Sequence, residues 1–212
     1  MSCFYEITHL PSIHAAVWHI TETVDELLTI VQPDEEDRLT CESFKLNQRK
    51  KQWLACRALL SHLLSPMPVK LFYDQSGKPL LISGTHHISV SHAGDYAAAV
   101  ISGYGKVGID IEYILPRIER VKERFMNNDE LASLSSSPTL EQLYYYWCCK
   151  EALYKLHGSH SVDFRNDIRI KPIDYLCATK GTGKATLVFG SEFDEYSVYC
   201  EKIDGLMVAV AY

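Results

Sequence analysis

Two acidic residues interrupt an apolar run in the middle of the chain. Residues 107–114 read VGIDIEYI and carry Asp110 and Glu112 two positions apart. Alternate side chains of a β-strand share a face, so Ile109 and Ile111 would point into a core while the two carboxylates point the other way. The backbone positions of the two acids would then lie about 7 Å apart. A D-x-E pattern is also common on solvated strands, so these acids alone favour a half-exposed strand.

A third acid, Glu151, takes the place of an apolar residue on a predicted helix. The apolar stripe of this helix follows helical spacing through Leu140, Leu143, Tyr144 and Trp147. The next position on the stripe is Glu151, and a desolvated carboxylate without a partner is costly. Glu151 should therefore be protonated, face a cleft or have a cationic partner such as Lys155, one turn further on. The alternative is a solvated Glu-to-Lys pair on the helix surface, which contributes little.

If the three carboxylates face one cleft, they form a site made only of oxygen ligands. Such a site suits Mg²⁺, or Mn²⁺, which keep several waters and accept phosphate oxygens. A phosphate-bearing substrate would also need cations, and the candidates are Lys155, Lys150, Arg49, Arg57 and Lys78. The residue types therefore predict a metal-dependent site that acts on a phosphate or diphosphate, and they leave the reaction open.

The elements that must position these residues fall into two halves. In the first half we expect a strand near residues 15–20, a helix begun by the acidic run 33–37, and a helix over residues 47–64. Strand pairs follow around the turns at GKP and AGD. In the second half, residues 107–114 predict a strand and residues 119–134 a helix.

The long helix of the second half should begin with Pro138 at its first position and end at Gly158. The segments IRIKPI, KATLVF, YSVYCEKI and LMVAVAY then predict strands. Because the halves end in similar runs, DYAAAVIS and LMVAVAY, we expect an α+β fold of two similar α/β lobes related by duplication. The predicted lobes are residues 1–103 and 104–212, the second carrying the acidic motifs.

The composition fits a soluble globular protein. Of 212 residues, 47% are hydrophobic and 23% charged, and the net charge of -6 gives no general attraction to nucleic acid or anionic lipid. The seven cysteines include no CxxC spacing, which argues against a zinc site and favours reduced thiols. No signal peptide or membrane span is expected, so we predict a cytoplasmic protein.

The motifs resemble those of a known family. VGIDIE, residues 107–112, followed by WCCKEALYK, residues 147–155, is similar to the paired signature of the 4'-phosphopantetheinyl transferase superfamily, (V/I)G(I/V)D(I/V)E and WxxKEAxxK. Residues 49–60, the GKP turn and SVSHAG at residues 89–94 lie in the order expected for the family. The length and the two similar halves resemble the surfactin-type branch, in which one polypeptide contains both lobes.

The resemblance implies an activity and roles for the acids. The enzyme would transfer the 4'-phosphopantetheine arm of coenzyme A to a serine of an apo acyl or peptidyl carrier protein, releasing adenosine 3',5'-bisphosphate. Asp110, Glu112 and Glu151 would bind Mg²⁺ at the diphosphate of coenzyme A. Glu151 would take the serine proton, directly or through a water, and Lys155 would bind the α-phosphate and stabilise the leaving group.

The resemblance also implies ligands for coenzyme A, and these are Arg49, Arg57, Lys78, Ser91, His92, Asp110 and Lys155. Ser91 and His92 would contact its phosphates, Lys78 its nucleotide end, and Arg57, with Arg49, its 3'-phosphate. Taken alone, His92 would more commonly be a histidine hydrogen-bonded at a turn.

A partner surface is predicted just after the acidic pair. Carrier proteins of this family's reactions are acidic helical bundles, so a basic surface with an apolar centre should dock them. The residues proposed for docking are Arg117, Arg124, Phe125 and Met126. An amphipathic helix with a solvated charged face is the alternative for this segment.

Two other functions remain open from the sequence. The same acids could activate water in a metal-dependent phosphohydrolase, or the chain could be a catalytically silent module that binds coenzyme A for regulation. We expect a monomer that binds neither nucleic acid nor membrane. The sequence does not identify the carrier protein.

Overall fold

The computed structural model describes residues 4–158, 162–172 and 179–212. The chain forms two compact units, residues 1–105 and 106–212, each with its own core. The predicted fold class, α+β, is confirmed. The predicted lobe boundary after residue 103 stays a prediction, as does the duplication, although both units pair an antiparallel sheet with one 18-residue helix.

Unit 1 packs one long helix against a four-stranded antiparallel sheet of order β1-β2-β6-β5, and its two other helices pack on that helix. Its strands in this sheet are β1 (Phe4–Ile7), β2 (Ile13–His19), β5 (His87–Ala93) and β6 (Tyr96–Ser102). Its helices are α1 (Val24–Val31), α2 (Glu35–Ser43) and α3 (Asn47–Leu64), and a separate hairpin joins β3 (Leu71–Tyr73) to β4 (Pro79–Leu81). The sequence predicted α2, α3 and the two hairpins and missed β1 and α1.

The long helix α3 supplies the centre of the core of unit 1. Leu54, Leu59 and Leu60 are fully buried in the same apolar cluster as Trp18 of β2. Gln52 donates from Nε2 to the carbonyl oxygen of Gly94 at 2.8 Å, and so ties α3 to the turn between β5 and β6. This hydrogen bond therefore fixes the position of Arg49, which lies one turn before Gln52 on α3, relative to β5.

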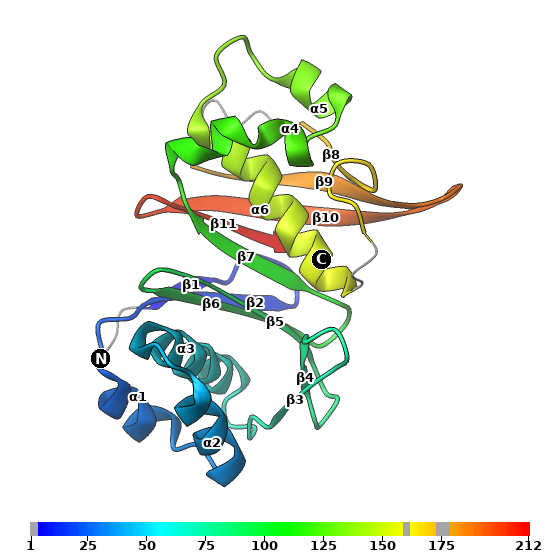
Figure 1. The fold of residues 1–212 in the computed structure, drawn as a ribbon. Helices are drawn as coiled ribbons and strands as arrows, with labels where there is room; N and C mark the ends of the chain where they lie inside the picture. Colours follow the sequence, from blue (N-terminus) through cyan, green and yellow to red (C-terminus); the bar gives the residue numbers. More distant parts are fainter. Residues whose placement is uncertain (1–3, 159–161, 173–178) are drawn as a thin grey trace. The chain divides into compact units, whose positions relative to one another are not determined.

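Unit 2 lays one long helix across a five-stranded antiparallel sheet of order β7-β11-β10-β9-β8 (Figure 1). The strands are β7 (Gly108–Tyr113), β8 (Ile168–Ile170), β9 (Lys180–Phe189), β10 (Glu192–Ile203) and β11 (Leu206–Ala211). The helices are the 3₁₀-helix η1 (Pro116–Arg120), α4 (Lys122–Phe125), α5 (Asn128–Ser133) and α6 (Leu140–His157). The helix predicted over residues 119–134 is therefore broken into short pieces.

The start of α6 differs from the prediction by two residues. Thr139 is the N-cap, and it forms a capping box with Gln142 at distances of 2.9 and 3.3 Å. Pro138 therefore precedes the helix, because the hydroxyl of Thr139 accepts a free backbone N–H of the first turn and Gln142 accepts the N–H of Thr139 in return. The predicted end is confirmed, since Gly158 closes the helix in the left-handed region with φ 77°.

In the described part of the chain, we find no helix that is long and apolar enough to cross a membrane. The five described cysteines, Cys41, Cys56, Cys148, Cys149 and Cys200, are buried free thiols.

Candidate active site

The acidic strand β7 packs closely against α6. A Cβ atom placed on Gly108 would lie 1.9 Å from the carbonyl oxygen of Ala152 and 2.7 Å from the backbone nitrogen of Leu156. Only glycine, which has no side chain, permits this approach of strand and helix. The glycine at the start of GIDIE therefore sets the separation between the acids of β7 and the side chains of α6.

Asp110 projects from β7 toward α6. Lys155 donates from Nζ to Asp110 Oδ1 at 2.7 Å, and the Asp110 side chain is only 6% exposed. Ile109 and Ile111, the neighbours of Asp110 along the strand, are buried as well. The strand alternation expected from sequence is observed, but both faces of β7 are largely covered at this point.

Glu112 lies near the end of the same strand, and 27% of its side chain is exposed. Trp147 donates its indole Nε1–H to Glu112 Oε1 at 3.4 Å, and Arg117 approaches Oε2 at 3.5 Å. Burial raises the pKa of Glu112, and repulsion from Asp110 adds to the effect, against the smaller opposing influence of these two partners and Lys155.

Glu151 is a partly buried carboxyl group of α6 whose pKa is raised. Burial raises the pKa of Glu151 to about 7, and the charges of Asp110 and Glu112 raise it while Lys155 lowers it. For Lys155, burial lowers the pKa, but the attraction of Asp110 and Glu151 outweighs burial and the net shift is upward. Near neutral pH the β7–α6 site, formed by Asp110, Glu112, Glu151 and Lys155, therefore holds a charged lysine beside a carboxyl group that can gain or lose a proton.

The donor types of the β7–α6 site fit a hard divalent cation. Asp110, Glu112 and Glu151 offer only oxygen ligands. Their negative charges repel one another, and a bound cation would offset this repulsion. Within the described ranges, however, no three His, Cys, Asp or Glu side chains are arranged so that they could hold a metal ion. Asp110 and Glu112 are engaged by Lys155 and Arg117 instead, so the metal site stays a prediction.

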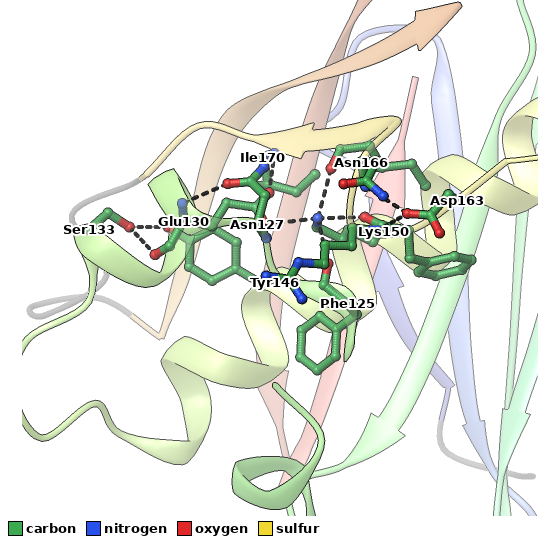
Figure 2. A network of polar contacts seen from close by, with 12 residues as sticks. Phe125, Asn127, Glu130, Ser133, Tyr146, Lys150, Asp163, Asn166 and Ile170 are labelled. Atoms are coloured by element: carbon green, nitrogen blue, oxygen red, sulfur yellow. Dashed lines mark hydrogen bonds and ion pairs between the residues drawn. The ribbon is translucent and has the colours of Figure 1, made fainter. Parts of the chain in front are cut away.

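Lys150 is not available to a substrate. Its side chain is 0% exposed and pairs with Glu130 at 2.8 Å, as Figure 2 shows. We therefore correct the expectation that Lys150 is a candidate phosphate-binding cation. The sequence placed it beside Glu151, but the two neighbours on α6 point into different surroundings.

The predicted docking segment divides into exposed cations and buried apolar residues. Phe125 and Met126 are 2% and 0% exposed and belong to the core of unit 2, so they provide no apolar centre for a partner. Helix α4 ends at Phe125, whose ring meets that of Trp147 on α6 edge to face, with the ring centroids 5.0 Å apart. Arg124 is exposed, and Arg117 is exposed while it reaches Glu112.

In unit 1, the structure brings together Arg49 of α3 and His92 of β5, two of the predicted coenzyme A ligands. A guanidinium nitrogen, Nη1, of Arg49 contacts the imidazole Nε2 of His92. Ser91 precedes His92 on β5 and is buried. Its carbonyl oxygen accepts a hydrogen bond from the Cys56 thiol of α3 at 3.7 Å. The packing of α3 on β5 thus gathers an arginine and a histidine at the surface.

Lys78 lies in a hydrogen-bonded hairpin turn between β3 and β4. Asp74 Oδ1 accepts the Lys78 backbone N–H at 3.0 Å and both the backbone N–H and the hydroxyl of Ser76, at 2.8 and 2.6 Å. Gly77 takes φ 78°, a conformation that favours glycine. One carboxylate oxygen therefore fixes the turn that presents Lys78.

Arg57 has structural partners instead of an open phosphate-binding position. It makes a bidentate ion pair with Asp37 at 2.8 and 3.2 Å. It also donates to the Tyr73 hydroxyl at 3.3 Å, and its guanidinium lies over the Trp53 ring. Its side chain is 7% exposed. Arg57 therefore ties α3 to α2 and β3.

Sequence reasoning missed Glu130, the buried partner of Lys150, and gave no role to Gly108. An N-x-x-E capping pattern at residues 127–130 was a readable signal for the start of α5. The pattern cannot show that the same glutamate also reaches a lysine 20 residues away. The contact of Gly108 with α6 likewise depends on tertiary packing.

The fold and the β7–α6 site define a class: a two-unit α+β protein in which an acidic strand faces a helix carrying a carboxyl group and a lysine. Residues 106–210, nearly all of unit 2, match the family model described as the 4'-phosphopantetheinyl transferase superfamily. Through this match unit 2 belongs to the 4'-phosphopantetheinyl transferase superfamily.

Individual relatives agree with the family match. The chain is 37% identical over 116 residues to the 4'-phosphopantetheinyl transferase AcpT of Escherichia coli O157:H7, covering 52% of this chain and 59% of that protein. It is 32% identical over 133 residues to the transferase psf-1 of Bacillus pumilus, covering 58% and 57%. It is 24% identical over 147 residues to the transferase ffp of Bacillus subtilis, covering 65% and 64%. The matches thus span less than two thirds of each relative's length.

Proposed function

We propose that this protein transfers the 4'-phosphopantetheine arm of coenzyme A to a serine of an apo acyl or peptidyl carrier protein, and that it belongs to the surfactin-type branch. The observation that carries the proposal is the contact of Lys155 with Asp110 at 2.7 Å, beside Glu151 with its raised pKa, inside the matched residues 106–210. The names of the relatives support the transferase activity.

In this mechanism Glu151 is the base. A serine hydroxyl is a weak nucleophile, so its attack requires a positioned base that removes its proton. The serine oxygen forms a bond to the phosphorus on the pantetheine side, and the bond from that phosphorus to the bridging oxygen breaks. The proton passes to Glu151, directly or through a water, and adenosine 3',5'-bisphosphate leaves.

Lys155 stabilises the departing group. Its pKa is raised, so it stays protonated and can hold the α-phosphate as negative charge builds there. Asp110, which bonds Lys155, keeps the ammonium in place.

Asp110, Glu112 and Glu151 would hold the divalent metal, Mg²⁺ or Mn²⁺. When bound, the ion would neutralise charge on the diphosphate of coenzyme A. The remaining coenzyme A ligands we propose are Arg49, His92, Ser91 and Lys78, with Arg57 acting through its support of α3. Arg117 and Arg124 are the proposed cations for carrier docking, and a cytoplasmic monomer remains our expectation.

Intact-mass measurement tests the proposal. The full chain is incubated with coenzyme A, Mg²⁺ and apo carrier proteins of the fatty acid, polyketide and peptide types. We expect a gain of one phosphopantetheine arm on a carrier, absent with Glu151→Gln and absent in chelator. No gain on any of the three types contradicts the proposal.

Two other outcomes identify the alternative functions. Release of adenosine 3',5'-bisphosphate from coenzyme A without carrier modification indicates a phosphohydrolase. Binding of coenzyme A with neither product indicates a silent module.

A further inference from the structure

Lys150 sits at the centre of a saturated polar cluster in the interior of unit 2. Its ammonium donates to three carbonyl oxygens, those of Phe125 at 2.8 Å, Phe164 at 2.7 Å and Ile168 at 2.7 Å. Glu130 Oε2 is a fourth acceptor at 2.8 Å. An ammonium has three protons, so every proton has a partner and one is shared.

Glu130 extends the cluster to two more backbone groups (Figure 2). Its Oε1 accepts the N–H of Ile170 at 2.8 Å, and its Oε2 accepts the N–H of Asn127 at 2.9 Å. The pair therefore connects α6 with the end of α4, the start of α5, the loop at residue 164 and the edge strand β8. These segments come from both sides of α6 in the sequence.

The neighbour of Lys150 on α6 is Glu151, the proposed base. Successive residues of an α-helix are rotated by about 100°, so any rotation of α6 that moves Lys150 moves Glu151 as well. Apolar packing is non-directional and tolerates small rotations of a helix. A cation with four acceptors does not, because each hydrogen bond weakens steeply as its angle opens.

We infer that the buried Lys150–Glu130 pair is a positioning device that fixes the rotation and height of α6 and so aims Glu151 at the proton it removes. Lys150 touches no substrate in this role and acts through Glu151. The inference rests on the proposed transferase function.

The expected effect follows from the tolerance of catalytic geometry. Displacement of a catalytic group by about 1 Å can lower the rate by about 100-fold. The proposed coenzyme A contacts of Arg49, His92 and Lys78 belong to unit 1 and should change little. A positioning defect therefore lowers kcat and leaves the KM for coenzyme A nearly constant.

The test variant is Lys150→Met combined with Glu130→Gln, which removes both charges and keeps the volumes similar. We expect a folded protein with cooperative unfolding, a kcat lowered by about 10- to 100-fold, and a KM for coenzyme A within about threefold of wild type. A second readout is Mg²⁺ titration followed by tryptophan fluorescence, since Trp147 contacts Glu112. We expect the Mg²⁺ concentration at half-saturation to be higher in the variant.

The matched control is Tyr146→Phe, one turn before Lys150 on α6. It removes only the hydroxyl contact with Ser133, which is 2.8 Å long. This variant should lose stability but keep kcat within about twofold of wild type, which separates positioning from general destabilisation. Glu130→Gln alone removes the counter-ion of Lys150 but leaves the ammonium its three carbonyl partners, and it should give an intermediate loss of kcat.

Two results overturn the inference. One is a folded double variant, or a folded Glu130→Gln if the double variant does not fold, with wild-type kcat and Mg²⁺ half-saturation. The other is a loss of kcat in Tyr146→Phe as large as in the paired variants. A wild-type protein that modifies no carrier defeats the proposed function instead, so the two failures are distinct.

Discussion

Gly108 allows a sharp prediction, because three backbone atoms of α6 lie within 3 Å of the position that a Cβ atom would take. An added Cβ would meet the carbonyl oxygen of Ala152 at 1.9 Å, its carbonyl carbon at 2.9 Å and the nitrogen of Leu156 at 2.7 Å. All three atoms belong to the backbone, so no side chain can turn away to make room.

The variant Gly108→Ala must move β7 and α6 apart. The shortest contact has to grow from 1.9 Å to at least 3.0 Å, a shift of 3.0 − 1.9 = 1.1 Å. Overpacking of this kind costs about 3 kcal/mol. The same shift stretches the 2.7 Å bond between Asp110 and Lys155, so kcat should fall by about 100-fold even where the variant folds.

Urea unfolding followed by circular dichroism measures the stability, and carrier modification measures kcat. Gly105→Ala is the matched control, because its added Cβ meets nothing within 4 Å and its φ is not positive. The reasoning is refuted if Gly108→Ala unfolds at the same urea concentration as Gly105→Ala and transfers as fast.

Further predictions concern pH, the hairpin turn and Arg57. Because the folded pKa of Glu151, about 7, exceeds the ordinary 4.5, the folded state binds more protons between these values and its free energy of unfolding falls as pH rises through them. In chelator we expect a loss of about 1–3 kcal/mol over this window in urea titrations, and a smaller slope in Glu151→Gln. Asp74→Ala removes the acceptor of three hydrogen bonds in the Lys78 turn and should raise the KM for coenzyme A in steady-state assays with little change in kcat, whereas an unchanged KM would show that the turn is not used. Arg57→Met should lower the urea midpoint, by about 1–3 kcal/mol in free energy, because it leaves Asp37 without its two-pronged partner. Arg49→Met should instead raise the KM for coenzyme A without this loss of stability, and the reverse pattern would contradict the roles assigned to the two arginines.

The sequence predicted the parts of the fold that local patterns determine. Helix α3, helix α6 with its end at Gly158, and the strands of unit 2 follow from periodicity, turn residues and capping. The helix expected over residues 119–134 failed, because Met126 turns into the core in an extended conformation and Asn127 starts a new capping box. The short strand β1 and helix α1 lacked a long enough pattern to be read.

The candidate site was predictable in its residue types and less so in its partners. Spacing on β7 and α6 identified Asp110, Glu112, Glu151 and Lys155, because strand and helix periods are local properties. The surroundings of Lys150, Arg57 and Phe125 depend on segments far away in the sequence, so no local pattern distinguishes a buried cation from a phosphate ligand. Their burial and pairing emerged only from the packed structure.

The pairing of Lys150 with Glu130 also constrains how the family can vary. Loss of either partner alone leaves a buried charge without its counter-ion, which typically costs about 3–5 kcal/mol, a large share of the stability of a small protein. A lineage can therefore change the two positions together far more easily than one at a time. Across relatives, the residues aligned with 130 and 150 should covary, and the capping glutamate of a short helix would be inherited together with a lysine 20 positions later.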